Sequence, residues 1–477
     1  MSYFLGIDLG TSYFKAGVFD QEGSLKGIGR ESVEKHSENG IGCELPVETF
    51  WKALRLCIKD ALVQAGCQAE DILALSYSSQ TNSFILLDSN DRPLTPLILW
   101  PDSRADEQSE RLQTLVSKKD FLHKTGLGIT PGKQNTIAKI EWIQANQADT
   151  WSKVSKILSI SDYLIYNLTG KFVSDTSTSA MTGLLDVPES KWWSDALNLF
   201  SISTTQLATP LEVGTLVGTL TEQGAEISGL STKTQLFTGC LDHHAVAIGA
   251  GATRPGTISE STGTVLACVS AATGYNPRVG INMARGFGLN HYFQMAFDNN
   301  GAVALEWYQK NHAPHYSIAE LIQLAGSIAP GADGLIARSQ VHTFPGLEGF
   351  INRTSKHEEG HFVRAILESV ALSLFHLVQA LEGKTKGNYI VPSGGGAQSR
   401  LWLQIKGNLL NKPFRVPESV ELACKGAAML CAVGMGYFDT LDEATKQQVT
   451  FKEEIHPDPG ESALYSKWNN QITNSVI

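Results

Sequence analysis

The sequence lacks the features of several large classes of protein. Its seven cysteines are scattered and form no C-x-x-C pair, so we expect reduced packing residues and neither a disulfide framework nor a metal site built on thiols. No apolar run approaches the ~20 residues that span a bilayer. The first residues carry neither the basic region nor the cleavage site of a secretory signal. We therefore expect a cytoplasmic protein with no membrane partner.

Clusters of lysine and arginine are also missing. The chain has 38 of these residues against 48 Asp and Glu, which gives a net charge of −10 at pH 7. Because surfaces that bind nucleic acid neutralise phosphates with clustered Lys and Arg, we expect no nucleic-acid partner. The 477 residues exceed the usual size of one hydrophobic core, so the length predicts roughly two to three domains.

Two common nucleotide-binding fingerprints are absent as well. The stretch GLGITPGKQ has Leu127 where a P-loop requires its first glycine, and Gln134 follows its lysine. The stretch GNYIVPSGGGAQS lacks the third glycine of a dinucleotide-binding turn. If this chain binds phosphate, it must do so through a different structural motif.

A glycine-containing turn between two strand-like runs is such a motif. Residues 4–20, FLGIDLGTSYFKAGVFD, predict a hairpin whose turn contains Asp8, Gly10, Thr11 and Ser12. In a plain hairpin the glycine would supply a positive φ and the aspartate would bond its own turn. In a phosphate site the backbone N–H groups and hydroxyls would face the phosphates. Asp8 would then hold Mg²⁺ through water, because this ion prefers oxygen ligands and keeps several waters.

A similar hairpin recurs later in the chain. Residues 256–270, GTISESTGTVLACVS, again place a Gly-Thr turn between two strands, which indicates a weak internal duplication. Strand and helix patterns alternate elsewhere, with a helix predicted over 48–66 and a buried strand over 71–79. We therefore expect an α/β fold with two related lobes and a cleft between them, where the two turns would clamp one polyphosphate.

Asp242 lies where an apolar strand ends and a helix begins. Its structural role would be a helix N-cap. Its functional role would be a general base that takes the proton of an acceptor hydroxyl during in-line phosphoryl transfer. His243 and His244 follow, but adjacent histidines on a helix point about 100° apart, so packing or hydrogen bonding is favoured over a shared metal.

Two further clusters have both a structural and a functional interpretation. The glycines at 394–396 either allow an unusual backbone or leave a flat surface onto which an adenine ring can stack. Trp100, Asp102 and Arg104 form either a loop capped by a salt bridge or a polyol site, in which charged groups bond hydroxyls.

Taken in order along nearly the whole chain, these motifs resemble those of the FGGY carbohydrate kinases, sugar and polyol kinases with the two-lobed actin-like ATPase (ribonuclease H-like) fold. The stretches that carry the resemblance are GIDLGTSYFKAGVFD, ILWPDSRADEQ, AKIEWIQAN, SDYLIYNLTGKFVSDTSTSAMTGLLDV, GCLDHHAVAIGAG, ESTGTVLA, GGGAQSRLWLQI and ELACKGAAMLCAVG. The resemblance implies an N-terminal, sugar-binding lobe at 1–245, a C-terminal, adenosine-binding lobe at 246–450 and a peripheral tail at 451–477.

The resemblance also implies ATP as the phosphoryl donor, Mg²⁺ as its metal and a set of site residues. It places Asp242 on the catalytic base and Asp8 on the carboxylate that is linked to Mg²⁺ through water. The residues that it implies for contacts with ATP are Thr11, Ser12, Lys15 and Thr264 at the phosphates, and Gly395, Gly396 and Arg400 at the nucleoside. The residues that it implies for contacts with the sugar are Gln80, Thr81, Asn82, Asp102 and Arg104.

The sugar loop SSQTNSF departs from the patterns known in the family. Xylulokinases resemble S-x-Q-M-H-G here and glycerol kinases Q-R-E, whereas this chain has Thr81-Asn82. The side-chain amides of Gln80 and Asn82 suit neutral hydroxyls better than a carboxylate. We therefore expect an ATP-dependent kinase that phosphorylates a primary hydroxyl of a neutral ketose or polyol, with a pentulose such as xylulose favoured.

Several alternatives stay open at this point. Ribulose, glycerol, erythritol and gluconate are other acceptors used within the family. An actin-like ATPase that transfers no phosphate to a small molecule would need no hydroxyl-directed base, which counts against it here. A homodimer is also left open.

Overall fold

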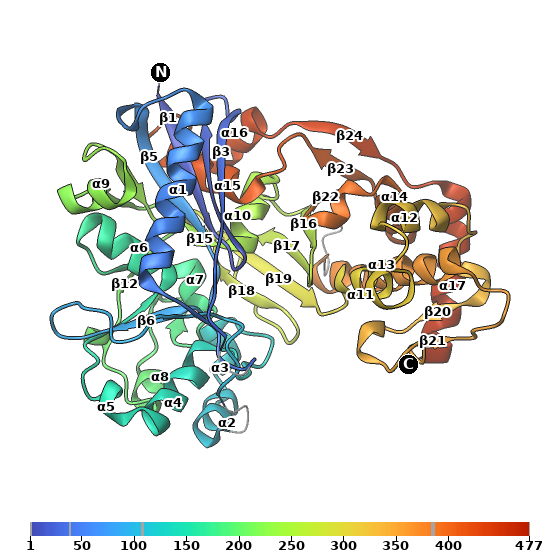
Figure 1. The fold of residues 1–477 in the computed structure, drawn as a ribbon, viewed down its shortest axis with the longest axis horizontal. Coiled ribbons are helices and arrows are strands. Elements are labelled where there is room, and N and C mark those ends of the chain that lie inside the picture. Colours follow the sequence, from blue (N-terminus) through green and yellow to red (C-terminus); the bar gives the residue numbers. More distant parts are fainter. Residues whose placement is uncertain (1, 38–39, 106–108, 383–386, 477) are drawn as a thin grey trace. The chain divides into compact units, whose positions relative to one another are not determined.

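The computed structural model describes residues 2–37, 40–105, 109–382 and 387–476, and the chain forms two compact α/β units (Figure 1). The first unit contains Met1–Thr253, Ala271–Gln294 and Glu421–Val449, and the second contains Arg254–Ser270, Met295–Val420 and Thr450–Ile477. The units are discontinuous along the chain, whereas the domains expected from sequence are continuous ranges, and those bounds stay a prediction.

The first unit is built on a sheet with the strand order β13-β14-β5-β1-β2-β3, in which β15 also pairs with β5. Its strands are β1 (Tyr3–Leu9), β2 (Tyr13–Phe19), β3 (Leu25–Ser32), β5 (Ile72–Ser79), β13 (Leu216–Thr219), β14 (Gln235–Phe237) and β15 (Cys240–Leu241). β1 and β2 pair antiparallel, which confirms the predicted hairpin. β5 runs parallel to β1, and β15 runs parallel to β5. The carboxyl ends of β1, β5 and β15 therefore meet at one edge of the sheet.

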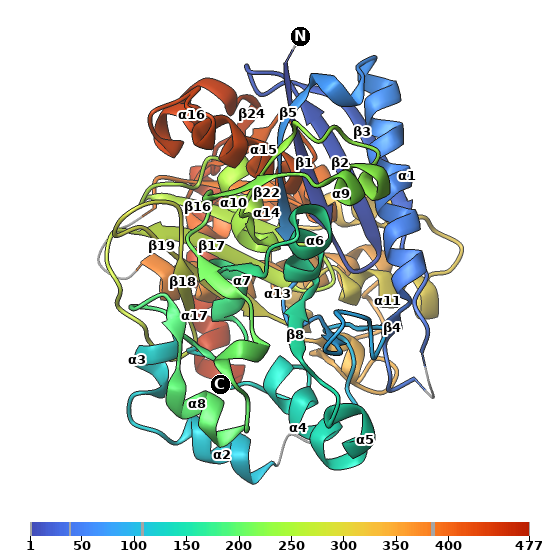
Figure 2. The ribbon, with the colours of Figure 1, turned by 90° about the vertical axis from the view of Figure 1, so that its left-hand side faces the viewer.

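Helices lie against both faces of this sheet (Figure 2). Two of them approach it so closely that only glycine fits at the contact. α1 (Val47–Ala65) crosses β3 so closely that a Cβ at Gly29 would lie 1.8 Å from the carbonyl oxygen of Cys57. α15 (Leu422–Gly434) crosses β1, where a Cβ at Gly6 would lie 1.8 Å from the carbonyl oxygen of Cys424. The helix predicted over 48–66 is confirmed as α1, and the small residues of α15 are explained by this close packing.

The second unit contains a sheet in which β17, β16, β22, β23 and β24 are consecutive neighbours. Their bounds are β16 (Thr257–Thr262), β17 (Leu266–Ala272), β22 (Tyr389–Ser393), β23 (Phe414–Pro417) and β24 (Phe451–Ile455). β16 and β17 pair antiparallel, which confirms the second predicted hairpin. β22 leads through the 3-10 turn Gly395–Gln398 into α14 (Arg400–Leu410).

The last segment of the chain, expected to be a peripheral tail, is part of this second unit. β24 pairs antiparallel with β23 and extends the sheet. α17 (Pro459–Val476) carries Tyr465, whose side chain is fully buried. The Tyr465 hydroxyl donates to Glu368 at 2.7 Å and accepts from Arg364 at 2.6 Å. The pairing of β24 with β23 and the buried Tyr465 hydroxyl therefore hold this last segment within the second unit. The polar composition of the segment did not predict these contacts.

Glu368 and Arg364 lie on α13 (Glu359–Glu382), the longest helix of the second unit. By length and composition alone α13 could cross a membrane, but 67% of its most apolar window is buried inside the protein. A core helix meets the same criterion, and the ion pair on α13 has its partners within the unit. We therefore describe α13 as a core helix.

Candidate active site

Asp8 lies near the carboxyl end of β1, beside Ser78 of β5. The Ser78 hydroxyl donates to Asp8 Oδ1 at 2.8 Å. Burial raises the pKa of Asp8 to about 6; the Ser78 hydrogen bond and the Lys15 charge act in the opposite direction. Gly10 does not adopt a positive φ, but a Cβ there would lie 2.7 Å from the carbonyl oxygen of Tyr13. The plain-hairpin alternative is therefore wrong for the glycine, and the hydrogen bond of Asp8 Oδ1 goes to β5.

Lys15 lies opposite Asp8 on β2 and pairs with a carboxylate that the sequence analysis missed. The Lys15 ammonium lies 2.6 Å from Oε2 of Glu421, and Glu421 is the residue directly before α15. Burial lowers the pKa of Lys15, but the hydrogen bond and charge of Glu421, together with the charge of Asp8, outweigh burial and raise it. The side chain is therefore a cation beside Asp8. The available signal for Glu421 was its place at the start of a small-residue helix.

Asp242 begins α10 (Asp242–Gly249), as predicted, directly after β15. The N-cap position is taken by Leu241, so the predicted N-cap alternative is wrong. Leu241 pairs with Ser79 of β5 while Asp8 pairs with Ser78, so Asp8, near the end of β1, and Asp242, directly after β15, lie on strands that both neighbour β5. The charge of Asp242 contributes to the raised pKa of Asp8. Two carboxylates in electrostatic contact at one sheet edge can together hold a hard cation through water and accept a proton.

His244 is a packing residue, as the sequence analysis favours. Its ring is buried, its Nδ1 lies 2.7 Å from Ser177 Oγ, and it stacks on Phe293 with the ring centroids 4.8 Å apart. Burial lowers the pKa of His244 to about 3, so the ring is neutral. Among the residues that the structure describes, no group of three or more His, Cys, Asp or Glu is placed to hold a metal. All seven cysteines are free thiols, six of them buried, as predicted.

The acceptor loop, defined here as Gln80–Ser83, follows β5 at the same edge. Thr81 Oγ1 donates to the carbonyl oxygen of Thr178 at 3.3 Å. Asn82 has a φ of 56°, a left-handed conformation that asparagine adopts more readily than most residues. Asn82 Oδ1 accepts from the backbone N–H and the hydroxyl of Thr136, both at 3.0 Å. The acceptor of the Asn82 amide is therefore engaged by the start of α4 (Thr136–Asn146).

A buried lysine on α4 holds this loop and was missed by the sequence analysis. Lys139 Nζ donates to the carbonyl oxygens of Asn82 at 2.6 Å and Leu99 at 2.8 Å. Burial lowers the pKa of Lys139 to about 7, while the charge of Asp102 raises it. The motif AKIEWIQAN was visible in the sequence, but the two carbonyl partners of its lysine were not.

Asp102 and Arg104 form the salt bridge of the structural alternative. Asp102 is fully buried, and Arg104 Nη2 lies 2.6 Å from Asp102 Oδ2 and 2.6 Å from Glu44 Oε1. The N–H of Cys43 also donates to Asp102 Oδ2, at 2.8 Å. The capped loop is thus confirmed, and contact of either residue with a sugar stays a prediction.

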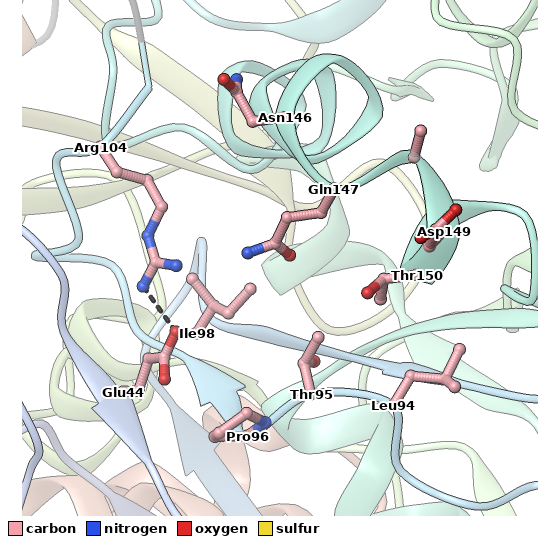
Figure 3. Close-up of a pocket in the computed structure, with 11 residues that line it drawn as sticks. Glu44, Leu94, Thr95, Pro96, Ile98, Arg104, Asn146, Gln147, Asp149 and Thr150 are labelled. Carbon is pink, nitrogen blue, oxygen red and sulfur yellow. Dashed lines mark hydrogen bonds and ion pairs between the residues drawn. The ribbon is translucent and has the colours of Figure 1, made fainter.

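Arg104 also lines a cavity of about 620 Å³, with Glu44 at its margin (Figure 3). The other residues that line it are Leu94, Thr95, Pro96, Ile98, Asn146, Gln147, Ala148, Asp149 and Thr150. Neither aspartate of the sheet edge and no residue of the acceptor loop belongs to this lining. The cavity is therefore separate from the pair Asp8 and Asp242.

In the second unit, the glycine turn after β22 has the exposed surface that stacking requires. Gly394 and Gly395 are exposed, and Gly394 has a φ of 75°. Gly396 is buried, and a Cβ there would lie 2.7 Å from Thr262 Cβ. Arg400 begins α14 with its side chain 72% exposed and its Nε 2.8 Å from Glu453 Oε1. The contacts of these residues with a nucleoside stay predictions.

A buried ion pair lies beneath the turn of the second hairpin. Lys406 Nζ lies 2.9 Å from Glu260 Oε1 and 2.6 Å from Thr262 Oγ1, and all three side chains are buried. Thr264, the predicted phosphate contact, is exposed at the turn itself. The exposed turn therefore rests on a charged cluster within the core of the unit.

Comparisons with known proteins agree with this arrangement. Sequence profiles of the FGGY family of carbohydrate kinases match residues 3–249 with the N-terminal domain and residues 293–435 with the C-terminal domain. The chain belongs to the FGGY family of carbohydrate kinases. A xylulose kinase of Lactococcus lactis is 30% identical, with 98% of this chain and 95% of the relative covered. A gluconokinase of Bacillus subtilis is 26% identical, with 92% and 89% covered.

The solved structure of a ligand-bound xylulose kinase from Lactobacillus acidophilus matches this FGGY kinase with a TM-score of 0.88 at 22% identity, covering 100% of this chain and 99% of that one. This match shows the fold, and it confirms the predicted fold class. Membership of the family makes the chain a kinase that transfers phosphate to an alcohol group of a carbohydrate, with ATP as the donor that the family uses.

Proposed function

We propose that this FGGY kinase transfers the γ-phosphate of ATP to a primary hydroxyl of a neutral ketose or polyol, with a pentulose such as xylulose as the first candidate. The observation that carries the proposal is the pair Asp8, near the carboxyl end of β1, and Asp242, directly after β15; both strands neighbour β5, which the acceptor loop follows. The similarity to a xylulose kinase over 98% of this chain supports the pentulose.

Asp242 would be the general base. The backbone N–H of His243 donates a hydrogen bond to Asp242 Oδ1 at 2.7 Å, and Asp242 is partly exposed. Oδ2 would take the proton of the acceptor hydroxyl while that oxygen bonds to the γ-phosphorus and the bond from phosphorus to the β,γ-bridging oxygen breaks. The proton then resides on Asp242, and ADP is the leaving group.

The residues around Asp8 fit Mg²⁺. A pKa of about 6 leaves the carboxylate mostly ionised at neutral pH, and Ser78 fixes one of its oxygens. Asp8 would hold the ion through water, and Mg²⁺, when bound, stabilises charge on the phosphates. Thr11, Ser12 and Lys15 would bind these phosphates from the same hairpin. In the second unit the ATP contacts proposed are Thr264, Gly395, Gly396 and Arg400.

The charges near the acceptor loop favour a neutral acceptor. Lys139 donates to two backbone carbonyls, and Arg104 is paired with two carboxylates. Both basic side chains are therefore already engaged, whereas a sugar acid would need a free cation for its carboxylate. Asn82 has its oxygen bonded to Thr136, so its NH₂ group would donate to a sugar hydroxyl.

The test is coupled ADP release with Mg·ATP and a panel of xylulose, ribulose, glycerol, erythritol and gluconate. We expect turnover that depends on a neutral sugar and a loss of at least ~10²-fold in Asp242→Asn, with thermal unfolding and nucleotide binding preserved. Asp195→Asn is the matched control, because Asp195 lies exposed on α8 (Ser194–Leu199).

Gluconate as the best acceptor would overturn the neutral substrate, and ATP hydrolysis indifferent to every sugar would favour the actin-like ATPase alternative. The cytoplasmic location and the homodimer stay predictions.

A further inference from the structure

Gln80 has no hydrogen-bonding capacity left for a sugar. Its side chain is 3% exposed. Nε2 donates to the carbonyl oxygens of Leu9 and Gly10, both at 3.3 Å. Oε1 accepts from Thr11 Oγ1 at 3.3 Å and from Ser83 Oγ at 2.9 Å. A side-chain amide offers two donors and two acceptor sites, so all of them are engaged by the protein.

The partners of Gln80 belong to a closed ring of hydrogen bonds. Ser83 Oγ, which donates to Gln80, accepts from the N–H of Trp100 at 2.9 Å. Trp100 Nε1 in turn donates to Thr11 Oγ1 at 2.6 Å. The ring therefore joins three segments of the first unit: the turn after β1, the acceptor loop after β5, and the segment after β7 (Leu97–Ile98).

Thr11 is the member of this ring that a phosphate would disturb. Its hydroxyl has one proton, which is directed to Gln80 Oε1 at 3.3 Å, the longest bond in the ring. The same hydroxyl is a proposed phosphate contact. If the Thr11 hydroxyl donates to a phosphate oxygen, it can no longer donate to Gln80 Oε1. Gln80 Oε1 then accepts a hydrogen bond from Ser83 only. The change is passed to the acceptor loop through a buried side chain, without contact between that side chain and either substrate.

We propose that Gln80 is a positioning residue that couples the phosphate turn to the acceptor loop, so that nucleotide and acceptor change each other's affinity. The proposal rests on the proposed function, and it replaces the sugar contact that the family resemblance implies for Gln80. Coupling of this kind is reciprocal, so it is measured equally well from either ligand.

The experiment measures the dissociation constant of D-xylulose by calorimetry, with and without Mg²⁺ and a non-hydrolysable ATP analogue. The ratio of the two constants is the coupling factor, and we expect about 5-fold or more in the wild-type protein. Gln80→Met keeps the approximate volume and removes all four hydrogen bonds. Trp100→Phe removes the indole N–H together with part of the ring, and because Trp100 is 36% exposed we expect the variant to fold. Gln80→Met should bring the factor to within twofold of one, and Trp100→Phe, which opens the ring but keeps the bond from Thr11 to Gln80, should lower the factor by a smaller amount.

Asn82→Ala is the contrasting variant, because the Asn82 side chain lies outside the ring. It should weaken xylulose binding by the same factor with and without nucleotide, and so leave the coupling factor unchanged. A role for Gln80 that is merely structural would likewise change both constants together. The emission of Trp100, obtained as the difference between wild type and Trp100→Phe, should change when the nucleotide analogue binds to the wild type.

The outcomes separate the two proposals. Turnover of xylulose with a coupling factor of one in the wild type, or a wild-type factor retained in both Gln80→Met and Trp100→Phe, overturns the coupling and leaves the kinase assignment standing. A wild-type protein that neither binds nor phosphorylates any sugar of the panel overturns the proposed function and the coupling together.

Discussion

The two hairpins of this kinase share a turn but place their charges differently. Each strand pair encloses a Gly-Thr turn, at Gly10-Thr11 in the first unit and at Gly263-Thr264 in the second. In the first unit the charges lie on β2 and directly before α15, where Lys15 and Glu421 are 24% and 19% exposed. In the second unit Lys406 and Glu260 lie beneath the turn with no exposure.

The same kind of hairpin turn can therefore serve two roles, ligand binding in the first unit and stability in the second. Charges that solvent and ligands can reach are suited to holding a metal and phosphates. Charges that are fully buried cannot reach a ligand and act on the stability of the unit. The comparison therefore predicts that equivalent substitutions at the two hairpins will affect different measurements.

The largest effect on stability is expected for Lys406→Met. The substitution leaves the Glu260 carboxylate buried without its cation, and breaking a buried pair in this way costs about 3–5 kcal/mol. Urea unfolding gives the free energy, and the double variant Lys406→Met/Glu260→Gln should recover part of the loss. A loss below about 1 kcal/mol would show that the pair contributes little to the second unit.

Gly396→Ala is expected to have the next largest effect. Its Cβ would lie 2.7 Å from Thr262 Cβ, and such overpacking costs about 1–3 kcal/mol. Gly395→Ala is the matched control, because a Cβ there has no atom within 4 Å and stability should change by no more than about 0.5 kcal/mol. Melting temperatures of the two variants give the comparison, and equal values would contradict the packing described here.

Asp8→Asn should raise stability at neutral pH while it slows turnover. The folded protein binds the Asp8 proton more tightly than the unfolded chain, because the pKa rises from 3.8 to about 6. The wild type therefore loses stability as the pH rises from about 4 to about 6, and asparagine, which does not ionise, avoids this loss. Thermal unfolding in EDTA should show equal stability near pH 4 and a more stable variant near pH 8. A variant that is less stable near pH 8 would refute the raised pKa.

The smallest stability effect is expected for Lys15→Met, the counterpart of Lys406→Met in the first unit. Its pair with Glu421 is partly exposed, so unfolding should change by about 0–1 kcal/mol. The KM for ATP should rise, because Lys15 is a proposed phosphate contact. A large loss of stability with an unchanged KM would remove the distinction between the two hairpins.

Local patterns in the sequence predicted the elements that position the site. The two hairpins follow from Gly-Thr turns between strand-like runs, and the end of α1 follows from Gly66, which adopts a φ of 64°. Asp242 was expected at a helix start because an apolar strand precedes it. Each of these signals lies within about 20 residues of chain, which is the range over which turn and helix chemistry acts.

Ion pairs and hydrogen bonds between residues that are distant in sequence could not be predicted from local patterns of this kind. Lys15 and Glu421 are 406 residues apart, and Lys406 and Glu260 are 146 apart. Gln80 was expected to face a sugar, whereas its carbonyl partners lie about 70 residues earlier. The polar alternation of FKEEI in β24 was not recognised as a strand, because an edge strand exposes half of its side chains.

The packing of α15 against β1 has a consequence for how this protein is made. The carbonyl of Cys424, against which Gly6 packs, is synthesised more than 400 residues after Gly6. At about 5–20 residues per second, one face of the first sheet stays uncovered for roughly 20–80 s of translation. The strand of this sheet that is synthesised first thus completes its packing among the last, and its uncovered face is the surface that chaperones would need to protect.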